Sequence, residues 1–60
     1  MARYRLYHLQ NFRLAGLDEI EAADDGEAAA LARARGGPGV IEIWCGNRRV
    51  RTVAPAGAAN

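Results

Sequence analysis

The stretch IEIWCGNRRV, residues 41–50, joins two strand-like runs through the dipeptide Gly46-Asn47. A Gly-Asn pair between such runs is typical of a two-residue β-hairpin loop, because glycine adopts a positive φ without steric cost. With this pair as the loop, an uninterrupted antiparallel register places Ile43 opposite Val50. The remaining predicted pairs are Cys45–Arg48, Trp44–Arg49, Glu42–Arg51, Ile41–Thr52 and Val40–Val53.

Alternation along these two strands separates a core side from an outer side. The predicted core side is the more apolar one and comprises Ile41, Ile43, Cys45, Val50 and Thr52. The predicted outer side comprises Val40, Glu42, Trp44, Arg49, Arg51 and Val53. On the outer side, Trp44 opposite Arg49 suggests a cation–π pair worth about 0.5–1 kcal/mol. Glu42 opposite Arg51 suggests a cross-strand ion pair worth about 0.2–1 kcal/mol.

The preceding stretch ADDGEAAALARARGG, residues 23–37, predicts a helix over residues 25–35. Asp24 and Glu27 fit an N-cap residue and its partner three positions later, a variant of the capping box. The alanines and Leu31 are strong helix formers, and Gly36 suits the left-handed position at which helices commonly end. The stripe expected to face the sheet comprises Ala28, Leu31 and Ala32, with the leucine contributing most of the contact.

The N-terminal third of the chain predicts a first hairpin. Residues 3–9, RYRLYHL, are rich in aromatic and branched residues and predict a strand, and a weaker strand is expected over residues 12–21 after a turn at Asn11. Gly16 suggests a β-bulge that resets the alternation, so that Leu17 or Ile20 points inward. In the first strand, the expected inner face comprises Tyr4, Leu6 and His8, and the outer face comprises Arg3, Arg5, Tyr7 and Leu9.

Together these elements predict an α+β fold of the type ββαββ. A four-stranded, mainly antiparallel sheet would carry one helix on one face and leave the other face open. The strand order 2-1-3-4 is favoured, and the order 1-2-3-4 is the alternative. Residues 1–54 are expected to form a single small domain, followed by a disordered tail over residues 55–60.

Composition limits what a chain of 60 residues can do. The net charge of +1 provides no strong field for nucleic acid or an anionic membrane. One cysteine and one histidine exclude an intramolecular disulfide and a His/Cys metal cluster, and no cofactor is expected. A domain of this size is marginally stable, so association with a second copy or another protein is the default expectation. The chain shows no membrane-spanning run or export signal, and its lone thiol points to the cytoplasm.

The sequence favours a non-enzymatic protein-interaction module that self-associates through its outer sheet face or an edge strand. The predicted interaction surface comprises Tyr7, Glu42, Trp44, Arg49 and Arg51. The alternative is a weak single-stranded nucleic-acid-binding protein, in which bases stack on Trp44 and Tyr7 and arginines reach the phosphates. A third hypothesis is an enzyme that uses His8 and Cys45 as a nucleophilic pair, which is conceivable if the first and third strands are neighbours.

The chain also resembles a group of short alphaproteobacterial proteins that have no assigned function. The resemblance rests on Tyr4-Arg5-Leu6-Tyr7, two aspartates before an alanine-rich helix, Glu42-Ile43-Trp44 and Gly46-x-Arg48-Arg49-Val50, and it covers residues 3–53. The chain departs from that group at His8, where an aromatic residue is common, and at residues 11–14, where the group has a Gly-His-Ile-like turn. The resemblance implies this fold and a bacterial cytoplasmic setting, and it transfers no activity or ligand.

Overall fold

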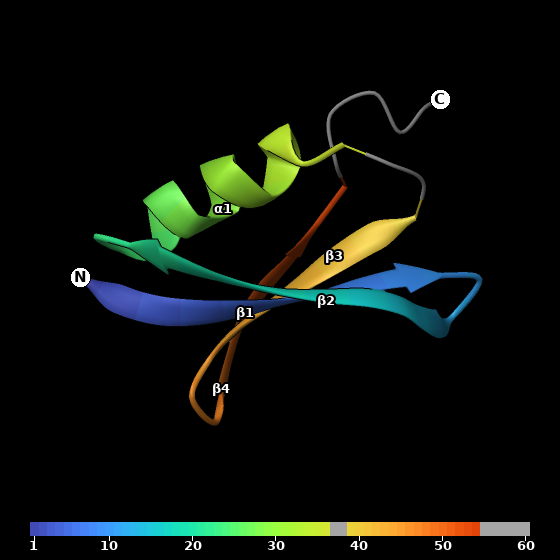
Figure 1. Ribbon diagram of the computed structural model, residues 1–60, viewed down its shortest axis with the longest axis horizontal. Coiled ribbons are helices and arrows are strands. Elements are labelled where there is room, and N and C mark those ends of the chain that lie inside the picture. The colour runs from blue at the N-terminus through green and yellow to red at the C-terminus, as the bar shows by residue number, and fades with distance from the viewer. Residues whose placement is uncertain (37–38, 55–60) are drawn as a thin grey trace.

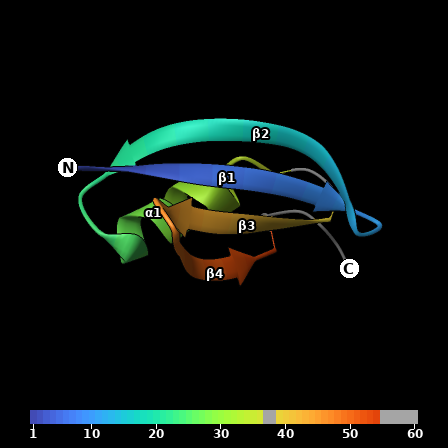
Figure 2. The same cartoon turned by 90° about the horizontal axis from the view of Figure 1, so that it is seen from below.

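The computed structural model describes residues 1–36 and 39–54, which form a four-stranded antiparallel sheet with one helix on one of its faces (Figure 1). The elements are β1 (Ala2–Gln10), β2 (Arg13–Ala22), α1 (Asp25–Ala34), β3 (Val40–Cys45) and β4 (Arg48–Val53). The strand order is β2-β1-β3-β4, so the predicted fold class and the favoured order are both confirmed. Figure 2 shows the sheet from the side opposite α1. The tail predicted over residues 55–60 lies outside the described residues.

The two central strands, β1 and β3, join the two hairpins into one sheet. Their antiparallel register aligns Leu6 with Ile43 and Tyr7 with Glu42. Leu6 and Ile43 are fully buried, whereas Tyr7 and Glu42 lie on the opposite face and are partly exposed. The predicted faces of the first strand are therefore confirmed, with Tyr4 buried beside Leu6.

A β-bulge in β2 confirms the predicted effect of Gly16. The register pairs His8 with Gly16 and Leu9 with Leu14, so Ala15 is an extra residue without a partner in β1. An extra residue on one strand changes which side chains face the core beyond it. The strand itself begins one residue later than predicted, at Arg13 rather than at residue 12.

Beyond the bulge, the two residues of β2 predicted as alternatives for the inner face, Leu17 and Ile20, lie on opposite faces of the sheet. Ile20 lies opposite the buried Tyr4 and packs against the core. Leu17 lies opposite Tyr7 on the other face and is 53% exposed. Of the two alternatives, the inward residue is therefore Ile20.

The second hairpin confirms the Gly46-Asn47 loop and the first two predicted pairs, Cys45–Arg48 and Trp44–Arg49. Beyond these pairs the predicted register is wrong. Ile43 pairs with Arg51 instead of Val50, because Val50 forms a bulge in β4. The other pairs that differ from the prediction are Glu42–Thr52 and Ile41–Val53.

This bulge exchanges the predicted faces of the last three residues of β4. A shift of one residue moves every later side chain to the other side of a sheet. Val53, predicted outside, lies opposite the core residue Ile41 and is buried. Thr52, predicted inside, is exposed opposite Glu42. Arg51, predicted outside, lies opposite Ile43 on the side of the sheet that carries α1.

The helix begins as its sequence predicts. The Asp24 side chain accepts a hydrogen bond from the Glu27 amide at 2.8 Å, and the Glu27 carboxylate accepts one from the Ala23 amide at 2.6 Å. The first bond satisfies a backbone donor that the first turn leaves without an intrahelical partner. The second differs from a standard capping box, because its donor is the residue before the N-cap and not the Asp24 amide. At the other end, Gly36 has a φ of 71° and its amide donates to the Arg33 carbonyl at 3.3 Å.

The buried stripe of α1 differs from the prediction at one residue. The helix buries Ala28, Ala29 and Ala32, whereas Leu31 is 40% exposed. Three methyl groups on one side allow the helix backbone to approach the sheet closely, and the larger leucine then lies at the margin. The expectation that Leu31 carries most of the helix–sheet contact is therefore wrong.

The core that results is thin. The largest fully buried side chains of the described residues are Leu6, Ile41 and Ile43, all from the central strands. The helix adds only alanine methyl groups to this layer. Each large side chain contributes roughly 1.5–3 kcal/mol when it is fully buried, so the apolar stabilisation of this domain is small.

A polar link fixes the start of α1 to the sheet. The Tyr4 hydroxyl donates to Oδ1 of Asp25 at 2.7 Å, and the guanidinium of Arg48 donates to both oxygens of Asp25 at 3.0 and 3.3 Å. The hydrogen bond to Asp25, together with burial, raises the pKa of Tyr4 to about 12. The bonds from Arg48 and then Tyr4 lower the pKa of Asp25.

Candidate interaction surface

The sheet face opposite α1, here called the outer face, carries a group of apolar side chains. We define the apolar strip as Tyr7, Leu9, Leu14, Leu17, Val40 and Trp44, which the strand pairings place on this one face. Leu14 is 59% exposed and Val40 38% exposed. Figure 2 shows that no other described element covers this face. Exposed apolar groups gathered in this way commonly mark interaction sites.

The bulge in β2 is the reason that two of these leucines share a face. Leu14 and Leu17 are three residues apart, so a regular strand would direct them to opposite sides. Ala15 interrupts the alternation between them, and Leu14 lies opposite Leu9 while Leu17 lies opposite Tyr7. Sequence reasoning predicted the bulge but did not assign either leucine to the interaction surface.

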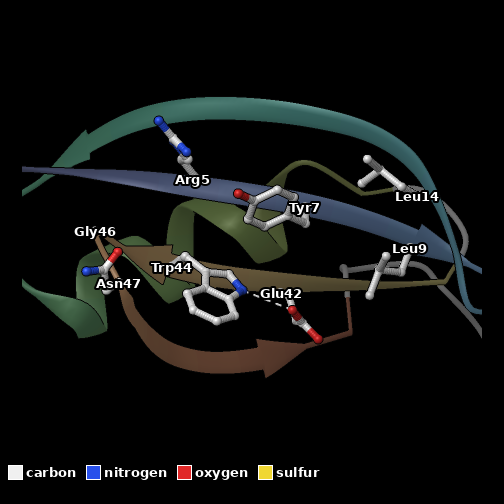
Figure 3. Close-up of a pocket in the computed structure, with 8 residues that line it drawn as sticks. All are labelled: Arg5, Tyr7, Leu9, Leu14, Glu42, Trp44, Gly46 and Asn47. Carbon is white, nitrogen blue, oxygen red and sulfur yellow. Dashed lines mark hydrogen bonds between the residues drawn. The ribbon is translucent and has the colours of Figure 1, made fainter.

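At the end of the strip away from the β1–β2 turn, Trp44 and Tyr7 are in contact. Their rings are 6.4 Å apart between centroids and nearly perpendicular, at 87°. An edge-to-face pair of this kind contributes about 0.5–1.5 kcal/mol beyond the burial of its area. The indole Nε1 donates to Glu42 at 2.9 Å (Figure 3). These contacts hold the two rings in one arrangement on the outer face.

Arg49 has its predicted strand partner, Trp44, whereas the predicted partner of Arg51 is wrong. Nη1 of Arg49 lies 3.9 Å from Oε2 of Glu42, so the guanidinium forms an ion pair with that carboxylate. Arg51 lies opposite the buried Ile43, on the side of the sheet that α1 covers. Arg51 is therefore not part of the outer face, and the predicted Glu42–Arg51 ion pair is replaced by Glu42–Arg49.

Between the aromatic pair and the leucines, the outer face forms a shallow groove of about 520 Å³. Side chains of β1, β2 and β3 line it, together with the Gly46-Asn47 loop (Figure 3). A second hollow adjoins the groove at Leu9 and is lined also by Val40 and by the β1–β2 turn at Asn11 and Phe12. The apolar surface is thus continuous from the second hairpin to the tip of the first.

Charged side chains border the strip in pairs of opposite sign. Arg3 lies 3.9 Å from Glu21 and Arg5 lies 3.5 Å from Glu19, each across the β1–β2 pairing. With the Arg49–Glu42 pair, the outer face carries three arginines and three glutamates, so its formal charge is zero. Exposed ion pairs of this kind contribute little stability, typically about 0–1 kcal/mol each.

Both edge strands have features that oppose further strand pairing. β2 and β4 each contain a bulge, at Ala15 and at Val50. Each also directs a charged side chain toward the helix side of the sheet: Asp18 lies opposite Leu6, and Arg51 lies opposite Ile43. Bulges and inward charges are two devices by which natural sheets avoid edge-to-edge association.

His8 and Cys45 do not meet. His8 lies opposite Ile41, and Cys45 follows four residues later in β3, which corresponds to about 13 Å along the strand. His8 is instead bonded to Asp18, with 2.8 Å between Nε2 and Oδ2, and Arg35 lies 3.7 Å from the same oxygen. The residues described by the structure contain no group of three or more His, Cys, Asp or Glu side chains placed to hold a metal ion.

Comparisons with known proteins do not identify a relative. No family model, curated protein or solved structure shows significant similarity to the chain. Within the described ranges 1–36 and 39–54, no helix has the length and apolar character that crossing a membrane requires.

Proposed function

We propose that this protein is a non-enzymatic interaction module that associates with a second copy of itself through the outer face. The observation that carries the proposal is the apolar strip, with its fixed Tyr7–Trp44 pair, on the face that α1 leaves uncovered. Trp and Tyr are enriched among the residues that dominate binding energy at protein interfaces. A sheet that packs face to face on another buries such side chains between two layers.

A second copy suits this face because of its balanced charge. The three arginine–glutamate pairs sum to zero, so two copies meet without net repulsion, and each offers both signs to the other. Association through an edge strand, the other route considered, is disfavoured by the bulges and inward charges of β2 and β4. The thin core adds a reason for association, since small domains often gain stability from a partner.

Light scattering and analytical ultracentrifugation over a wide range of protein concentration test the proposal. We expect a reversible monomer–dimer equilibrium that Trp44→Ala and Leu14→Gln each shift toward monomer by about tenfold or more. Leu31→Ala is the matched control, because it removes an exposed leucine from the helix side of the molecule. A protein that stays monomeric at every concentration, and whose Trp44→Ala variant behaves identically, contradicts the proposal.

The nucleic-acid alternative uses the same rings and has less support. Arg5 is paired with Glu19 and Arg49 with Glu42, so these arginines already have carboxylate partners on the outer face. Phosphates would have to displace those carboxylates, and Glu42 lies beside the indole on which a base would stack. Oligonucleotide binding that quenches Trp44 fluorescence, falls steeply with salt and is lost in Arg49→Ala would favour this alternative.

We also infer a cytoplasmic location, which the unpaired thiol of Cys45 supports because free cysteines are typical of reducing compartments. The resemblance to the short alphaproteobacterial proteins remains a hypothesis with the same implication. Neither argument supplies an activity. The separation of His8 from Cys45 along the sheet supports the non-enzymatic interpretation.

A further inference from the structure

The turn between β1 and β2 contains an aromatic residue in an unfavourable backbone conformation. Asn11 and Phe12 have φ values of 55° and 64°, and Gln10 pairs with Arg13, so these two residues form a two-residue loop of the type I′ kind. Asparagine tolerates a positive φ, but a bulky residue there is a true outlier. Phe12 is also fully exposed, so its ring gains no packing within the chain that would offset this strain.

The position of Phe12 links it to the outer face. Phe12 borders the hollow that Leu9 and Val40 also line, at the end of the apolar strip. Leu9 lines the groove as well, so an apolar path runs from Phe12 to the Tyr7–Trp44 pair. The turn requires a positive φ at this position but does not require a phenylalanine, and residues held in such strained conformations often mark a functional site.

We propose that Phe12 is the anchor residue of the dimer, and that in each copy it packs into the groove beside Tyr7, Leu14 and Trp44 of the second copy. This inference rests on the proposed self-association and names the residue that each copy contributes to the other. In a dimer with two-fold symmetry the exchange is mutual, because every contact occurs twice. The zero formal charge of the outer face allows the two groove borders to approach one another.

The dimensions of the strip suit such an exchange. Tyr7 lies two residues before Leu9 in β1, or about 7 Å along the strand, whereas Phe12 lies beyond Leu9 in the opposite direction, in the β1–β2 turn. A two-fold axis near Leu9 therefore brings the turn of one copy over the aromatic pair of the other. The groove, of about 520 Å³, has room for a phenyl ring, which can meet the edges or faces of both aromatic rings.

The variant Phe12→Gly separates the fold from the association. It places glycine after asparagine, the sequence that type I′ turns prefer, so the thermal midpoint of the monomer should rise by several degrees. It also removes the anchor, so the association constant should fall by about tenfold or more. The matched variant Phe12→Tyr keeps the ring and the backbone strain, and its association constant should stay within about threefold of wild type.

Mixing two weakened variants tests the exchange itself. The Trp44→Ala copy retains Phe12 but has a damaged groove, whereas the Phe12→Gly copy retains the groove. A heterodimer of the two has one intact anchor–groove contact, and each homodimer has none. Native mass spectrometry of the mixture should show heterodimer in excess of the statistical proportion.

The outcomes separate this inference from the proposed function. If the wild type dimerises and Phe12→Gly dimerises equally well, Phe12 is not the anchor and self-association stands. If the mixed variants form no excess of heterodimer, Phe12 of one copy does not pack into the groove of the other, and self-association again stands. If the wild type is monomeric at every concentration, the proposed function fails, and this inference fails with it.

Discussion

At the scale of single residues, the contact between Tyr4 and Asp25 makes a group in the core sensitive to pH. Tyr4 is almost entirely buried, and its hydroxyl donates to a carboxylate that Arg48 also binds. Deprotonation would place a phenolate against that carboxylate in the thin core. The protonated form of Tyr4 is therefore the one that the folded state stabilises.

This contact predicts a loss of stability at alkaline pH. The pKa of Tyr4 is about 12 in the folded state and 10.0 ordinarily, so its contribution is complete below pH 10 and is lost as the pH rises toward 12. Urea unfolding across that range should show a falling free energy of unfolding. In Tyr4→Phe most of this decline should be absent, at the expense of lower stability at neutral pH. Tyr7→Phe, which leaves the Tyr4–Asp25 bond in place, is the control. An equal decline in Tyr4→Phe and wild type would refute the assignment.

Single residues also explain which site members were predictable. Tyr7 lies in β1 and Trp44 in β3, and in both strands successive side chains alternate between the two faces of the sheet. This alternation is enough to predict that both rings point outward. Leu14 and Leu17 depend on where the bulge lies within β2, which Gly16 suggests only to within a residue. Phe12 lies in the turn and not in the strand predicted over residues 12–21, because nothing in the sequence indicates a phenylalanine with a positive φ.

At the scale of elements, local signals predicted the succession of strands and helix, the helix caps and the first two pairs of the second hairpin. The Gly46-Asn47 loop fixes only the pairs next to it, and the register beyond depends on Val50. Valine is an ordinary strand residue, so its presence at position 50 does not indicate a bulge. Gly16 is unusual inside a strand, which is why the bulge in β2 was predicted and the one in β4 was not.

The helix shows a second limit of sequence patterns. Its apolar residues are mostly alanine, so several faces are nearly equal in apolar character, and the pattern predicts that the single leucine faces inward. Close packing against the sheet decides otherwise, because the backbone approaches nearest where the side chains are smallest. The stripe of Ala28, Ala29 and Ala32 follows from that tertiary contact.

Opposite substitutions on the helix test this packing. Ala32→Leu inserts extra carbon atoms into a fully buried position and should lower the free energy of unfolding by about 1–3 kcal/mol. Leu31→Ala, by contrast, removes a partly exposed side chain and should change it by less than about 1 kcal/mol. Chemical denaturation measured by circular dichroism compares the two. A larger loss in Leu31→Ala than in Ala32→Leu would mean that the helix is rotated from the position described.

At the scale of the whole molecule, the thin core and the uncovered apolar face have the same cause, which is that the fold has only one small helix to cover the sheet. A single helix covers only one face of the sheet (Figure 1), and its alanines add little to the buried apolar volume. Packing the outer faces of two copies together would give each sheet a second apolar layer. Stability and association are then linked. Because the dimer dissociates when its chains unfold, a higher protein concentration favours the folded dimer.

This linkage predicts that thermal stability depends on protein concentration. Above the dissociation constant, each tenfold increase in concentration should raise the thermal midpoint by about 3–6 °C, since the gain of about 1.4 kcal/mol is shared by two chains. Trp44→Ala should flatten this dependence, and Leu31→Ala should preserve it, because only the former alters the outer face. Calorimetry over a hundredfold range of concentration measures both slopes. A midpoint of the wild type that does not change across that range would show that the outer face has no stabilising partner in a second copy, and that the thin core alone holds the fold.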